Sequence, residues 1–200
     1  GTFSDGSTQD LTGAVAWSSS DGAVATVSAG LAQSLSVGPT TITAADVTGD
    51  GRPDLIVPHR DGGQSHVYVN GDGRTFAGAA RVPFGPPTAN IRMSAAADLN
   101  GDGRQDLVTI DEKTGVATHF GEAGGRLSAG VPIGLGDQPP YALALGDLDG
   151  DGKTDIVGMS GRRADLTVAL GTGTGTFLPP IPYRVGGSPW EIAAADLNRD

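Results

Sequence analysis

The sequence predicts an all-β fold, namely a partial β-propeller with about three to four blades of roughly 50 residues and four strands each. Two observations carry this prediction. Thirty-three glycines and 13 prolines divide the 200 residues into short segments rich in Val, Ile, Thr and Leu, which is typical of strands joined by turns. In addition, an acidic motif recurs with its first aspartate at positions 46, 98, 147 and 196, at spacings of 52, 49 and 49.

The segments follow the same order in each period. A strand of small residues runs into the acidic motif, as in ITAAD, SAAAD, LALGD and IAAAD. An apolar strand follows at residues 55–57, 107–110 and 156–157, and then an alternating strand, HVYVN, VATHF or LTVAL. A glycine-rich turn (GDGRTF, EAGGRL or GTGTGTF) precedes a last strand flanked by proline. The small first strand suits the inner edge of a blade, where blades converge and side chains have least room.

The charge pattern restricts the class of partner. The formal net charge of −10 argues against nucleic acid, whose phosphates need a basic surface. Twelve of the 23 acidic residues lie in the four acidic motifs, which indicates cations as partners. No segment has the length of a membrane span, so no membrane insertion is expected. Neither the G-x-S-x-G nor the H-E-x-x-H motif is present, and no other pattern identifies an active site.

The acidic motifs match the front half of a calcium-binding loop. Positions are counted from the first aspartate of each motif. In the three complete motifs, oxygen-bearing side chains occupy positions 1, 3, 5 and 9, and glycines occupy positions 4 and 6. Calcium takes about six to eight oxygen ligands, so the backbone carbonyl at position 7 and water would complete the shell. A strand follows position 9 at once, which excludes an EF-hand. Acidic turns without metal are the alternative, since Asp, Asn and Gly favour turns.

The expected metal ligands therefore repeat through the chain. They are Asp46, Thr48, Asp50, Arg52 and Asp54 in the first loop; Asp98, Asn100, Asp102, Arg104 and Asp106 in the second; Asp147, Asp149, Asp151, Lys153 and Asp155 in the third; and Asp196, Asn198 and Asp200 in an incomplete fourth. The third loop is expected to bind Ca²⁺ most tightly, because it alone offers four carboxylates.

These residues resemble a known family. DLNGDGRQDLV and DLDGDGKTDIV, each preceded by an alanine-rich strand, look like FG-GAP/VCBS repeats over about residues 31–200. The resemblance implies a calcium-bearing β-propeller like the head of the integrin α-subunit, commonly of seven blades. It also implies a secreted or cell-surface protein, in which such repeats serve as adhesion modules, carbohydrate-binding modules or appendages of hydrolases and lyases.

Residues 1–30 differ from the repeats. SDGSTQDLT, WSSSD and VATVSAG are similar to the later strands of bacterial Ig-like domains of the BIG2 group. The competing interpretation is that residues 1–45 supply strands to a degenerate first blade. The early strands of an Ig-like domain are missing and the fourth acidic motif is cut off, so the chain is expected to be part of a longer parent chain.

A ligand site is also expected, at the other end of the blades. Arg92, Tyr141 and Trp190 each stand six residues before the first aspartate of a motif, so they should ring one mouth of the channel. Aromatic side chains there suit stacking on a sugar ring, although ordinary packing between blades is the alternative.

The sequence thus predicts a calcium-binding, non-enzymatic propeller module of a secreted or cell-surface bacterial protein. Its expected role is adhesion, or binding of a glycan or a surface protein. The alternative function is an accessory or catalytic propeller of a polysaccharide-active lyase or hydrolase.

Overall fold

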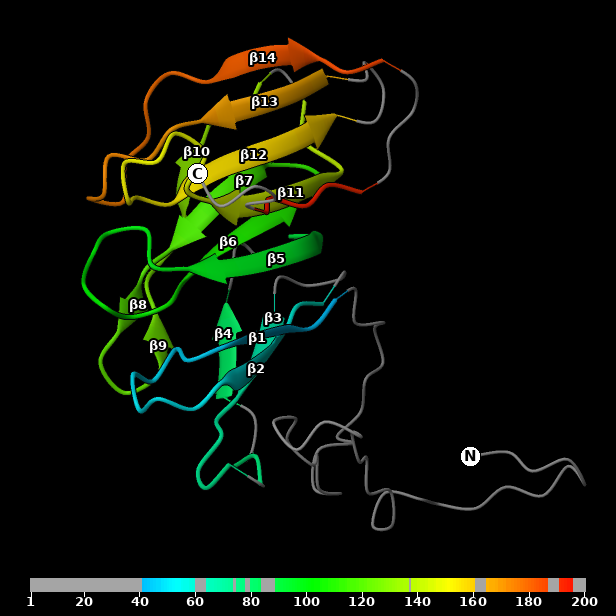
Figure 1. Ribbon diagram of the computed structural model, residues 1–200. Helices are drawn as coiled ribbons and strands as arrows, with labels where there is room; N and C mark the ends of the chain where they lie inside the picture. Colours follow the sequence, from blue (N-terminus) through cyan, green and yellow to red (C-terminus); the bar gives the residue numbers. More distant parts are fainter. Residues whose placement is uncertain are drawn as a thin grey trace, which may run out of the picture.

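A computed structural model describes residues 41–59, 64–73, 75–77, 80–83, 89–136, 138–160, 165–186 and 191–195. In these residues the chain forms three sheets of four antiparallel strands each and one two-stranded hairpin (Figure 1). The predicted all-β, partial propeller is confirmed. No helix long and apolar enough to cross a membrane occurs in the described ranges. The expected N-terminal unit of residues 1–30 lies outside them.

Each four-stranded sheet is one blade. The first blade has the order β1-β2-β3-β4, the second β5-β6-β7-β10 and the third β11-β12-β13-β14. Their bounds are β1 Thr43–Ala45, β2 Asp54–Val57, β3 Gln64–Tyr68, β4 Ala80–Pro83, β5 Ile91–Ala97, β6 Asp106–Asp111, β7 Gly115–His119, β10 Val131–Ile133, β11 Ala142–Gly146, β12 Asp155–Ser160, β13 Asp165–Ala169 and β14 Ile181–Arg184. Each blade therefore corresponds to one sequence period.

The innermost strands carry the small residues, as predicted. β5 lies between β1 and β11 and contacts both (Figure 1). The small side chains of these strands leave room for neighbouring blades to approach one another.

The pairing register is the same in every blade. The residue before each acidic motif pairs with the aspartate at position 9, as in Ala45 with Asp54, Ala97 with Asp106 and Gly146 with Asp155. Each acidic loop therefore connects the first two strands of its blade with the same number of residues.

The glycine-rich segment after the third strand forms a closed turn in each blade. Bridges between Asn70 and Phe76 and between Gly171 and Phe177 close this turn in the first and third blades. In the second blade the same closure is a short hairpin of β8 (Gly121–Glu122) and β9 (Arg126–Leu127). We call these segments, residues 70–76, 121–127 and 171–177, the glycine turns. The sequence predicts the turns, but not that their ends pair as strands.

The hydrophobic core lies between successive blades. One buried cluster combines residues of the first two blades, such as Val47, Ile56, Ile91 and Leu107. A second cluster combines residues of the second and third blades, such as Val108, Ile110, Leu143 and Ile156. Each blade is therefore stabilised mainly by apolar contacts with the neighbouring blades.

Candidate metal sites and a pocket between blades

The carboxylate at position 1 of each acidic loop organises the loop backbone. Asp98 accepts hydrogen bonds from the backbone N–H groups of Gly101 (2.7 Å) and Gly103 (2.9 Å). These glycines have φ values of 77° and 82°, a left-handed conformation that side chains disfavour. Asp46 and Asp147 accept the equivalent bonds in their own loops. The two glycines of the motif are thus explained by the turn that wraps around the first carboxylate.

The aspartates at position 9 tie three parts of a blade together. Asp54, Asp106 and Asp155 are 0%, 0% and 1% exposed. One oxygen of Asp106 accepts the N–H of Leu99 (2.9 Å) at position 2, and the other accepts the N–H of Gly121 (2.8 Å) at the start of the glycine turn. The same pair of bonds recurs at Asp54 and Asp155. In the first loop the oxygen of Asp54 that accepts the N–H at position 2 also accepts the N–H of Thr48 (3.2 Å). The position-9 carboxylates are thus engaged with the backbone, and Asp155 is not part of the carboxylate cluster formed by Asp147, Asp149 and Asp151.

Burial and hydrogen bonding act in opposite directions on these carboxylates. Burial raises the pKa of Asp54 and Asp106, and backbone N–H groups offset only part of the rise. Burial also tends to raise the pKa of Asp46, but hydrogen bonds from the N–H groups of its loop outweigh this effect, so the pKa of Asp46 is lowered. Asp46 therefore favours the charged form that a metal requires.

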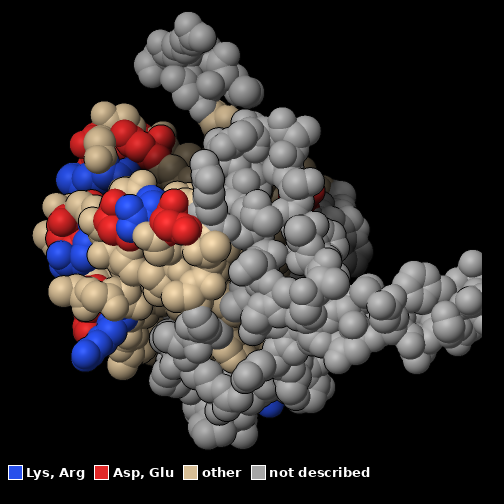
Figure 2. Space-filling view, turned by 90° about the horizontal axis from the view of Figure 1, so that it is seen from below, with Lys and Arg blue, Asp and Glu red and all other residues tan. Residues whose placement is uncertain are grey.

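The basic residue at position 7 pairs with the carboxylate at position 5 in all three loops. Arg52 with Asp50, Arg104 with Asp102 and Lys153 with Asp151 form ion pairs at 2.5 Å. The sequence predicts a role only for the backbone carbonyl of position 7, and the side-chain pairing is a feature it does not indicate. Acidic and basic residues accordingly lie side by side on the face seen in Figure 2, instead of forming one patch of a single charge.

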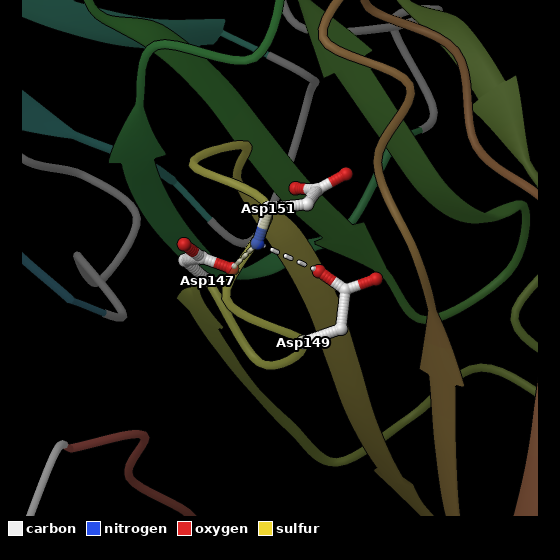
Figure 3. Close-up of side chains that lie close together, drawn as sticks. All are labelled: Asp147, Asp149 and Asp151. Atoms are coloured by element: carbon white, nitrogen blue, oxygen red, sulfur yellow. Dashed lines mark hydrogen bonds between the residues drawn. The ribbon is translucent and has the colours of Figure 1, made fainter. Parts of the chain in front are cut away.

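The third loop brings its carboxylates closest to a metal-binding arrangement. Asp147, Asp149 and Asp151 each offer an oxygen within 4.8 Å of the others (Figure 3). The N–H of Asp151 donates to both Asp147 (3.1 Å) and Asp149 (3.2 Å) and so holds these carboxylates side by side. The ion pair with Lys153 lowers the pKa of Asp151. Three carboxylates, which are hard oxygen donors, on a glycine-containing loop suit a divalent cation such as Ca²⁺.

The first and second loops carry neutral oxygen at position 3. The hydroxyl of Thr48 donates to Asp46 (3.3 Å), and the side-chain oxygen of Asn100 accepts the N–H of Asp102 (3.0 Å). Both side chains therefore lie within their loops, beside the predicted ligands. The expected ligands Asp196, Asn198 and Asp200 lie outside the described residues.

The predicted ligand residues Arg92 and Tyr141 lie together between the second and third blades. The guanidinium carbon of Arg92 lies 4.1 Å from the centre of the Tyr141 ring, and Nε of Arg92 lies 4.0 Å from Glu112. They line a pocket of about 320 Å³ together with Gln138, Pro139, Pro140 and Ser160. The sequence contains no signal for Glu112 or Ser160. Glu112 follows β6 and reaches Arg92 through the pairing of β5 with β6 in the second blade, whereas Ser160, at the end of β12, joins the pocket from the third blade. Trp190 lies outside the described residues.

Blades with an acidic loop between their first two strands define a β-propeller module of repeated motifs. The FG-GAP-like repeat family matches residues 98–158 and 147–200, and the FG-GAP repeat family matches residues 38–69. The matches to the FG-GAP-like repeat together span residues 98–200, about half of the chain, so the chain belongs to the FG-GAP-like repeat family. No curated protein matches the chain. The family match does not extend to residues 1–30, and the expected BIG2 resemblance is not shown.

Two solved structures share the fold. The chain is similar to BBS1N, solved in complex with ARL6DN (17% identity, TM-score 0.53, 78% of this chain and 46% of that chain). It is also similar to the Dos1 propeller (8% identity, TM-score 0.50, 78% and 39%). A third similar structure is an Agrocybe aegerita lectin that recognises non-reducing terminal N-acetylglucosamine (27% identity, TM-score 0.47, 69% and 36%). The chain spans less than half the length of each of these proteins.

Proposed function

We propose that this chain is a calcium-stabilised β-propeller module of a secreted or cell-surface protein, and that it binds a ligand such as a glycan or a surface protein. The observation that carries the calcium sites is the recurrence of one loop geometry in three blades, with three carboxylates within 4.8 Å of one another in the third. When bound, calcium would be held by the side chains at positions 1, 3, 5 and 9 and by the carbonyl at position 7. Its charge would offset the repulsion between the carboxylates of each loop.

Thermal unfolding tests the calcium sites. The melting temperature is measured with Ca²⁺, with Mg²⁺ and with chelator, for the wild type and for the double variant Asp149→Asn/Asp151→Asn. One site at a hundredfold excess of free Ca²⁺ over Kd contributes about 2.7 kcal/mol of stability, so a rise of several degrees is expected in the wild type and a smaller rise in the variant.

The matched control for this experiment is Glu122→Gln/Glu191→Gln, which removes two exposed carboxylates outside the acidic loops. It should keep the full response to Ca²⁺. An equal response to Ca²⁺ and Mg²⁺ would indicate divalent-cation sites without selectivity for Ca²⁺, and no response would leave the loops as acidic turns.

The ligand site that we propose is the pocket between the second and third blades. Arg92 supplies donors, Glu112 supplies acceptors, and Ser160 supplies both. The ring of Tyr141 and the two neighbouring prolines add flat apolar surface. A neutral sugar needs both kinds of polar group together with such a surface, and the opposite charges of Arg92 and Glu112 disfavour a strongly charged ligand.

Binding to an array of neutral oligosaccharides tests this pocket. Tyr141→Ala should lower binding at least about tenfold, since the stacking surface and the support of Arg92 are both lost. Tyr183→Ala is the matched control, because Tyr183 lies on β14, outside the lining of the pocket, and is 50% exposed. Equal binding by both variants would exclude the pocket, whereas release of products from a polysaccharide would instead favour a polysaccharide-active enzyme.

A further inference from the structure

The acidic loops of the first two blades each contact the glycine turn of the following blade. A Cβ placed on Gly125 would lie 2.7 Å from Cγ2 of Thr48, so the second blade closely approaches position 3 of the first loop. A Cβ placed on Gly175 would lie 2.5 Å from Cε1 of Phe120 in the second blade, and 3.6 Å from Cβ of Asn100, which is position 3 of the second loop. Gly125 and Gly175 are equivalent, because each is the fifth residue of a closed glycine turn.

A backbone hydrogen bond and a buried side chain strengthen this contact. The N–H of Gly175 donates to the carbonyl oxygen of Leu99 (2.9 Å), at position 2 of the second loop. The side chains at position 2 of the first two loops, Val47 and Leu99, are 0% and 2% exposed. Val47 packs in the same hydrophobic cluster as Leu127, and Leu99 packs in the same cluster as Phe177. Leu127 and Phe177 are the last residues of the glycine turns in the following blades.

The third loop lacks such a contact in the described part of the chain, and its burial differs accordingly. Leu148 at position 2 is 44% exposed. Asp147 and Asp149 are exposed as well, whereas Asp46, Thr48, Asp98 and Asn100 are each partly buried. Among the described residues, the same motif is thus covered in two blades and exposed in the third.

We infer that the glycine turn of each blade positions the acidic loop of the preceding blade, so that order within the loop is coupled to the docking of the two blades. The coupling passes through position 3, one of the predicted ligand positions, and through the buried residue at position 2. At Gly125 a side chain would displace Thr48 at position 3 of the first loop, and at Gly175 it would displace Phe120, which packs beside the second loop. The part of this inference that concerns metal affinity rests on the proposed calcium sites, whereas the positioning of the loop does not.

Two neighbouring glycines allow a matched test. Gly125 and Gly124 have φ values of 74° and 78°, so alanine strains the backbone similarly at either position. A Cβ on Gly124 meets no atom within 4 Å, whereas a Cβ on Gly125 meets Thr48. Hydrogen exchange of the Gly49 and Gly51 amides, which both donate to Asp46, reports order in the first loop and is measured by NMR in chelator.

We expect these two amides to exchange at least about tenfold faster in Gly125→Ala than in Gly124→Ala, while Gly150 and Gly152 of the third loop are unchanged. Equal exchange of the Gly49 and Gly51 amides in the two variants would overturn the inference. Adding Thr48→Ser to Gly125→Ala removes the methyl group that the new Cβ meets and keeps the hydroxyl. This second change should restore slow exchange, and failure to restore it would also count against the inference.

A Ca²⁺ titration followed at the same amides separates this inference from the proposed function. If Ca²⁺ shifts the loop resonances, Gly125→Ala should weaken binding at the first loop severalfold without affecting the third, and equal affinities in the two alanine variants would overturn the coupling. If Ca²⁺ shifts no resonance in the wild type, the proposed calcium sites fail, and the exchange rates in chelator still decide whether the glycine turn positions the loop.

Discussion

The buried aspartate at position 9 has a structural role before any metal binds. Asp106 is fully buried and pairs with two backbone N–H groups from different parts of its blade. The carboxylates at position 5 are instead exposed and paired with a flexible basic side chain. Two residues of the same motif and the same chemical type should therefore differ strongly in their contribution to stability.

Replacement of these two aspartates tests this difference. Asp106→Ala leaves the buried N–H groups of Leu99 and Gly121 without acceptors, at about 1–3 kcal/mol each, so we expect a loss of about 3 kcal/mol or more. Asp102→Ala removes an exposed ion pair and should cost less than about 1 kcal/mol. Urea unfolding in chelator measures both. Equal losses would mean that Asp106 contributes only through metal binding.

A buried histidine makes stability depend on pH. His119 is 0% exposed; its Nε2 lies 3.1 Å from the hydroxyl of Thr109 and its Nδ1 lies 3.2 Å from the carbonyl of Ser128. Burial lowers the pKa of His119 below its ordinary value of 6.5, and the Ser128 carbonyl offsets only part of this effect. Below pH 6.5 the unfolded chain therefore binds a proton that the folded chain does not.

This difference predicts a loss of stability on acidification. The free energy of unfolding should fall as pH drops below about 6.5, by up to about 1.4 kcal/mol per pH unit from this group, until the pH reaches the pKa in the folded state. His119→Asn removes the titrating group, so its free energy of unfolding should vary less between pH 7.5 and 5.5. Urea unfolding of both proteins across this range measures the difference, and identical pH profiles would exclude His119 as the cause.

The basic side chain at position 7 affects the charge of each acidic loop and, in the first two loops, its attachment to the glycine turn. Lys153 already neutralises part of the charge that would attract a metal, because it pairs with Asp151. In the first two loops the arginine also donates through Nε to the carbonyl of Asn70 (3.1 Å) or Gly121 (2.9 Å), which fastens the loop to its glycine turn. The basic side chain at position 7 thus supplies an internal cation to each acidic loop.

Removal of this cation should favour calcium. Lys153→Met is expected to tighten Ca²⁺ binding at the third loop by roughly two- to fivefold, because Ca²⁺ then no longer competes with the ammonium group. Isothermal titration calorimetry measures the affinity. Lys113→Met is the matched control, since Lys113 lies in the turn at the opposite end of β6 and β7. Weaker binding by Lys153→Met would show that the ion pair instead preorganises the loop for the metal.

The sequence predicts the elements of each blade well. The acidic motif and the small-residue strand before it are local patterns, and the structure reproduces the strands with an identical register at Asp54, Asp106 and Asp155. The position-7 ion pairs and the pairing within the glycine turns depend on where side chains meet after folding. Local spacing carries no such information, so the sequence does not predict them.

At the scale of the whole molecule, the period predicts that blades repeat but not which surfaces meet. Arg92 and Tyr141 are 49 positions apart and come together only because β5 packs beside β11. The contact of Gly125 with Thr48 has the same origin. What the sequence cannot predict here is therefore concentrated between blades, where the hydrophobic core also lies.

Position 2 of the acidic loops offers the sharpest test of this inter-blade core. Leu99 is 2% exposed and clusters with Leu143 and Phe177 of the third blade, whereas Leu148 is 44% exposed at the same position of the third loop. Leu99→Ala should cost about 2–5 kcal/mol, because it leaves a cavity between two blades. Leu148→Ala should cost less than about 1 kcal/mol, because its side chain is already partly in water. Urea unfolding in chelator compares the two variants, and equal costs would contradict the conclusion that the acidic loops are anchored by the following blade.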